Sequence, residues 1–71
     1  MKIIGKGILK QYSQTLDINE SVSSANLPEL MKLPENLREN VILVRDGRVL
    51  SPDELVSDDD EIILFVSVMG G

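Results

Sequence analysis

The sequence contains no cysteine and no histidine, two side chains that enzymes often use for catalysis and metal binding. Without cysteine there can be no disulfide, no thiolate nucleophile and no cysteine-based metal site. Without histidine the commonest general base and the commonest metal ligand are missing. Carboxylates remain, but no calcium-binding loop of alternating Asp, Asn and Gly is present. We therefore expect a protein that is not itself an enzyme and that holds no metal ion and no cofactor of its own.

Long apolar runs are also absent. No stretch approaches the roughly 18 residues that a membrane span requires, and the first residues lack the apolar segment of a signal peptide. With 71 residues the chain lies near the lower size limit for a domain without disulfides or metal. We predict one domain over residues 1–69, a flexible tail at residues 70–71, and a cytoplasmic location.

Basic side chains are few, with 7 Lys and Arg against 12 Asp and Glu and a net charge of −5. Nucleic acids and anionic membranes are bound through clustered Lys and Arg, so neither is an expected partner. The acidic charge suits docking onto a basic protein surface, and it equally promotes solubility.

The N-terminal part of the sequence predicts a hairpin followed by a short helix. Residues 2–4 begin a strand, and residues 12–18 alternate apolar and polar side chains, with a turn either near Lys6 or near residues 10–11. Residues 19–25 are small and polar, which is typical of a connection. A helix over residues 26–33 is expected, with Asn26 as its cap and Glu29 completing a capping box. Its apolar stripe consists of Leu27, Leu30 and Met31.

Further along, Pro34 ends this helix, and one more helical turn can follow it. Residues 41–44 form an apolar strand, and Asp46 followed by Gly47 is a strong signal for a type I′ hairpin turn into a short strand at residues 48–50. Ser51 and Glu54 have the spacing of another capping box. Four acidic or small polar residues at 57–60 predict a solvated turn.

The last predicted strand covers residues 61–69 and is apolar on both faces, which indicates a central position in its sheet. Its even members, from Ile62 to Val68, share one face, and we expect the helix stripe to cover Ile62, Leu64 and Val66. Phe65 and Met69 on the other face would remain uncovered, as docking surfaces often do. The alternative is that Phe65 packs beneath a loop.

The order of these elements predicts an α+β fold, a small mixed sheet with one short helix packed on one face. The sequence then ends in Gly70 and Gly71, directly after the apolar strand. Glycine lacks a Cβ, so such an ending is thin enough to enter a narrow enzyme channel. Loose terminal residues are the plainer interpretation.

The whole chain resembles the ThiS and MoaD sulfur-carrier family, which has the ubiquitin-like β-grasp fold, and it is slightly nearer ThiS. The resemblance is carried mainly by residues 57–65, Ser-Asp-Asp-Asp-Glu-Ile-Ile-Leu-Phe, and by the strand and Gly-Gly ending that follow. Residues 41–54 are similar to the family's block of strand, turn, strand and polar turn. Asp59 stands where the family usually has glycine.

The resemblance implies a function for the end of the chain. The carboxylate of Gly71 would be adenylated from ATP by a partner enzyme of the ThiF or MoeB type and then converted to a thiocarboxylate. Gly70 would supply the narrow approach, and Phe65 with Met69 would dock the partner. The sulfur donor would be a protein such as a cysteine desulfurase, and the acceptor a thiazole (thiamine) or molybdopterin synthase.

Two other functions remain open from the sequence. A ubiquitin-like modifier would use the same activated Gly71 to form isopeptide bonds with lysines of target proteins. A non-catalytic β-grasp interaction module would use neither ATP nor the glycine ending.

Overall fold

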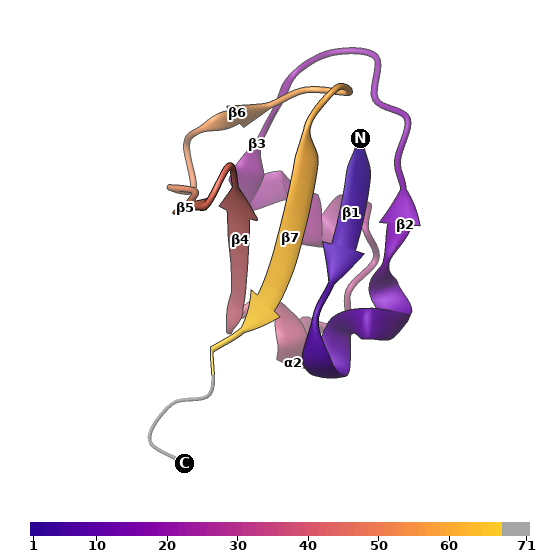
Figure 1. Ribbon diagram of the computed structural model, residues 1–71, viewed down its shortest axis with the longest axis vertical. Coiled ribbons are helices and arrows are strands. Elements are labelled where there is room, and N and C mark those ends of the chain that lie inside the picture. The colour runs from indigo at the N-terminus through magenta and orange to yellow at the C-terminus, as the bar shows by residue number, and fades with distance from the viewer. Residues whose placement is uncertain (68–71) are drawn as a thin grey trace.

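The computed structural model describes residues 1–67 (Figure 1). A mixed sheet of five strands has the order β2-β1-β7-β4-β5, and β3 pairs with β6 in a separate two-stranded sheet. The strands are β1 (Lys2–Gly5), β2 (Gln14–Thr15), β3 (Val22–Ser23), β4 (Val41–Arg45), β5 (Arg48–Val49), β6 (Leu55–Val56) and β7 (Glu61–Val66). The helical segments are the 3-10 helices η1 (Gly7–Tyr12) and η2 (Ser24–Asn26) and the α-helical turns α1 (Leu27–Leu30) and α2 (Glu35–Arg38). The predicted α+β class is confirmed.

Strand β7 lies at the centre of the large sheet, as its apolar character on both faces predicts. It pairs in parallel with β1 and antiparallel with β4. Its even members Ile62 and Leu64 are fully buried, and they pack in one core with Leu27 of α1. Figure 1 shows the helical segments of residues 24–38 behind the sheet, on this one face.

The helical region differs from the single helix expected over residues 26–33. Asn26 has φ −87° and ψ −10° and makes no capping hydrogen bond, so the predicted cap is wrong. The physical reason is that η2 already places Asn26 in helical geometry, whereas a capping residue needs an extended backbone. The α-helical turn ends at Leu30, whose side chain is 43% exposed, so its expected place in the buried stripe is also wrong. The helical turn after Pro34 is confirmed as α2.

The first hairpin contains η1 instead of a tight turn at either predicted position. In the register of the hairpin, Ile3 of β1 lies opposite Gln14 of β2. The 3-10 helix crosses so close to Gly5 that a Cβ there would lie 1.9 Å from the carbonyl oxygen of Leu9. Glycine at position 5 is therefore required by packing, and Leu9 is fully buried as a result.

The second hairpin has the predicted turn. Asp46 and Gly47 have φ values of 55° and 77°, as a type I′ turn requires. After β5, the carboxylate of Glu54 accepts a hydrogen bond of 2.7 Å from the backbone N–H of Ser51. This is half of the predicted capping box, but the segment forms a turn and no helix follows it.

Two further parts of the sequence prediction need correction. The connection at residues 19–25 contains β3, which pairs with β6. The two short strands are distant in the sequence, and their backbone N–H and C=O groups find hydrogen-bond partners in each other. Within the described residues the last strand is Glu61–Val66 and leaves out Ser67, although the N–H of Ser67 still donates to the carbonyl of Asn40 at 2.7 Å. The rest of the predicted strand, residues 68–69 and thus Met69, lies outside the described residues. No helix within residues 1–67 is long and apolar enough to cross a membrane.

Candidate functional site: the uncovered face of the sheet

The side of the sheet opposite the helical segments carries a continuous apolar surface. Strand register aligns Ile42 with Phe65, Val44 with Ile63, and Ile4 of β1 with the same Ile63. Because residues aligned across neighbouring strands point to the same side of a sheet, these side chains form one patch. We call it the outer face, and it consists of Ile4, Ile42, Val44, Val49, Ile63 and Phe65.

The outer face is open to solvent where the core face is closed. The side chains of Phe65 and Val49 are 41% and 60% exposed, and the remaining members are half-buried between their neighbours. By contrast, Leu64 on the core face is fully buried. A contiguous exposed patch of this kind, on a small domain, is typical of a surface that binds another protein.

The border of the outer face carries charges of both signs. Lys2 on β1 and Glu61 on β7 are paired in register, and Thr15 on β2 lies beside Lys2. Both charged side chains are exposed. An apolar centre with a polar rim is the ordinary composition of a protein interface.

A group of ion pairs fixes the loops beside the sheet. Arg45 on β4 contacts Asp60 at 3.0 Å, and Arg48 on β5 contacts Glu54 at 2.7 Å. The hydrogen bond from Arg48, followed by that from the Ser51 backbone, lowers the pKa of Glu54 to about 2. Glu54 is therefore ionised at neutral pH and holds the turn at residues 51–54 against β5.

A second carboxylate joins the two ends of the N-terminal hairpin to the acidic turn. Asp58 accepts hydrogen bonds of 3.0 Å from the backbone N–H of Ile18 and of 3.2 Å from the α-amino group of Met1. These bonds, that from Ile18 first, lower the pKa of Asp58. Asp58 and Glu54 thus serve as acceptors that order loops. Within residues 1–67, no group of acidic side chains is arranged to hold a metal ion.

The structure places one of the four predicted site residues. Phe65 lies in the middle of the outer face, and its exposure shows that the alternative position beneath a loop is wrong. Met69, Gly70 and Gly71 lie outside the described residues, and their roles stay predictions. The contributions of Ile42 and Val44 were not predicted, because alternation along one strand does not reveal its register against the next.

Comparison with known proteins adds no relative. The sequence matches no protein-family profile, and it matches no curated protein.

Proposed function

We propose that this chain is a sulfur carrier of the ThiS/MoaD type with a β-grasp fold, activated at the carboxylate of Gly71. The observation that carries the proposal is the outer face, which runs along β7, the strand that leads into the glycine ending. Such a carrier needs a surface that a partner enzyme can bind and a terminal carboxylate that the enzyme can modify. The outer face supplies the first and the Gly70–Gly71 ending the second.

The architecture supports the β-grasp part of this proposal. The resemblance implies a small mixed sheet with a short helix on one face, and the chain has a mixed sheet with α1 and α2 on one face. Helical cover on that side leaves the outer face as the natural docking side.

The spacing between the outer face and the ending is suited to a partner with two adjacent subsites. Gly71 follows Phe65 by six positions in the sequence. A fully extended chain spans at most about 3.5 Å per residue, so the Gly71 carboxylate lies within about 20 Å of Phe65. A partner bound over Phe65 therefore needs its ATP site no farther than this distance from its docking surface.

The chemistry proposed for Gly71 is an activation followed by a substitution. A carboxylate oxygen attacks the α-phosphorus of ATP, which forms an acyl adenylate and releases pyrophosphate. A persulfide sulfur on the donor protein then attacks the acyl carbon and displaces AMP, giving an acyl disulfide. A thiol of the donor or of a small reductant cleaves that disulfide, leaving the thiocarboxylate on Gly71 and a new disulfide on the thiol side. The partner enzyme supplies the catalytic groups, which agrees with a carrier that has neither cysteine nor histidine. Because ATP is required, the cytoplasm is the compartment in which such a carrier would act.

Intact mass spectrometry tests the proposal. The full chain is incubated with ATP, inorganic sulfide and an adenylating enzyme of the ThiF or MoeB type. Sulfide replaces the persulfide here, because it displaces AMP directly and needs no reductant. Replacement of one oxygen by sulfur raises the mass by about 16 Da. Two control chains, one lacking Gly71 and one amidated at its carboxyl end, should gain no mass.

The competing functions give different results in the same experiment. Lysine-linked conjugates that form with a cell extract and ATP would identify a protein modifier instead. If the mass of the chain stays unchanged with every adenylating enzyme tried, the result would favour an interaction module without C-terminal chemistry. A gain of sulfur in either control chain would refute Gly71 as the reactive residue.

A further inference from the structure

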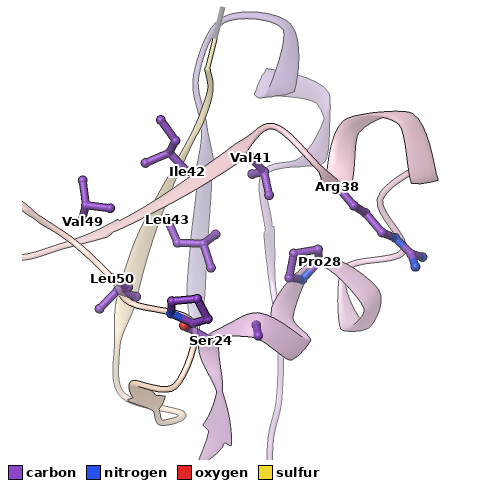
Figure 2. A pocket seen from close by; sticks show the side chains of 10 residues that line it. Ser24, Pro28, Arg38, Val41, Ile42, Leu43, Val49 and Leu50 are labelled. Carbon is purple, nitrogen blue, oxygen red and sulfur yellow. The ribbon is translucent and has the colours of Figure 1, made fainter. Parts of the chain in front are cut away.

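A groove lies between β4 and the segment that follows β5, on the side of β4 that faces away from β7 (Figure 2). Its cavity volume is about 320 Å³. The groove exists because the segment after Leu50 no longer pairs with β4. The carbonyl of Ser51 accepts a hydrogen bond from the side chain of Ser24, and the carbonyl of Pro52 accepts one from the N–H of Ala25. The two segments therefore diverge, with Pro28 of α1 between them (Figure 2).

The wall of this groove on the side of β4 is an open strand edge. The carbonyl of Leu43 accepts a bond from Leu50 on the side of β5, whereas the carbonyl of Asn40 bonds to Ser67 beyond β7. Because hydrogen-bonding directions alternate along a strand, the N–H and C=O of Val41 point away from β7. The register of β5 reaches only to Val44, so Val41 has no strand partner on that side within residues 1–67. An open edge of this kind can pair with an added strand.

The side chains beside that edge are mostly aliphatic. Figure 2 shows Val41 and Leu43 extending from β4 toward Pro28, and Leu50 closing the other side. Val41 and Leu43 occupy alternate positions, so a strand added along this edge would direct alternate side chains to the same side. The groove therefore fits an extended segment with small aliphatic residues at every second position.

One cation lies at the end of the groove where β4 begins. Arg38 of α2 is exposed, and its Nε donates a single hydrogen bond of 2.8 Å to the carbonyl of Leu33. Within residues 1–67 it forms no ion pair, while Arg45 and Arg48 are both paired with carboxylates. Because this guanidinium has no ion-pair partner within residues 1–67, it can bind one carboxylate on a segment in the groove, although the net charge of −5 disfavours a strongly acidic segment.

We propose that this groove binds an extended, mainly aliphatic segment of another protein that carries one carboxylate and pairs with Val41 as an added strand. Aliphatic side chains enter between Leu43 and Pro28, and a carboxylate contacts Arg38. Antiparallel pairing is the more stable arrangement, and it places the carboxylate at the C-terminal end of the segment, because Arg38 lies before the start of β4. The groove shares Ile42 and Val49 with the outer face, but within residues 1–67 its lining does not include Phe65. Because the proposal also uses no chemistry at Gly71, either proposal can fail without the other.

The test uses the full ¹⁵N-labelled chain and the peptide acetyl-Thr-Val-Thr-Val-Asp-amide, followed by NMR titration to millimolar peptide. We expect shifts in the amide signals of Val41 and Leu43 and in the Nε signal of Arg38. The amide signal of Phe65 should not shift. Arg38→Glu should weaken binding by about tenfold or more, as expected for loss of a charge-assisted hydrogen bond. Lys10→Glu is the matched control, because it makes the same charge change at an exposed position outside the groove.

Changes in the peptide test the same contacts without altering the fold. Replacing its Asp by Lys should weaken binding as Arg38→Glu does, and N-methylation of both Val residues should abolish binding, because their N–H groups face β4. Equal binding of the N-methylated peptide, a shift of Phe65 without shifts of Val41 and Leu43, or no shifts at all would overturn the proposal. Concentration-dependent shifts of Val41 and Leu43 without peptide would assign the groove to a second copy and overturn it as well.

Discussion

Replacing Phe65 by alanine separates docking from folding, because this side chain is on the outer face and only partly buried. Because Phe65 is 41% exposed, Phe65→Ala should cost about half of the loss for a fully buried phenylalanine, so we expect the free energy of unfolding to fall by about 2 kcal/mol. A domain of 71 residues has a free energy of unfolding of about 4–10 kcal/mol. The variant should therefore remain folded.

The loss in docking should be larger than a scattered surface change would give. An aromatic residue at the centre of an interface contributes about 2 kcal/mol or more, which corresponds to roughly 30-fold weaker binding. The assay is the Kd for an adenylating enzyme of the ThiF or MoeB type, measured by calorimetric titration, with urea denaturation of the free chain alongside. Leu55→Ala is the control, since Leu55 is 63% exposed but lies on β6, outside the outer face.

Two results would refute this reasoning. Equal Kd values for wild type, Phe65→Ala and Leu55→Ala would show that the outer face is not the docking surface. An unfolded Phe65→Ala chain would show that this side chain belongs to the core in spite of its exposure.

Three further predictions concern the fold. Gly5→Ala should lower the free energy of unfolding by about 3 kcal/mol in urea denaturation, because the new Cβ would overlap the carbonyl of Leu9; a variant of wild-type stability would contradict that contact. Leu64→Ala should cost about 3 kcal/mol through loss of a fully buried side chain, and a cost below that of Phe65→Ala would place the core on the wrong face. The pKa of Glu54 is lowered in the folded state, so its contribution to stability is present above pH 4.5 and is lost as the pH falls toward about 2. The urea midpoint of Glu54→Gln should therefore decline less than that of the wild type over this pH range. Parallel curves for the two chains would argue against the pairing of Glu54 with Arg48.

The parts of the fold that were predictable are those encoded by neighbouring residues. The Asp46–Gly47 turn needs positive φ at both positions, and few other residue pairs adopt it readily. The central position of β7 follows from apolar side chains on both of its faces. The acidic turn closes on itself, with Asp60 accepting from the N–H of Ser57 at 2.8 Å.

The parts that were not predictable depend on contacts distant in sequence. The pairing of Val22 with Val56 joins two-residue strands, which leave no periodic pattern to detect. The unusual path of η1 depends on a glycine that accommodates another residue's carbonyl, and a single sequence shows only that a glycine is there. For the candidate site, Phe65 was identifiable by alternation along its own strand, but the outer face as a surface required the register between β4 and β7.

The position of β7 has a consequence for how the protein is made. Without this strand, β1–β2 and β4–β5 would be two separate hairpins, and isolated hairpins are marginal in water. During translation, the five-stranded sheet therefore cannot form until residues 61–66 have left the ribosome. Amide hydrogens of both flanking strands should accordingly exchange at similar rates, through one global opening.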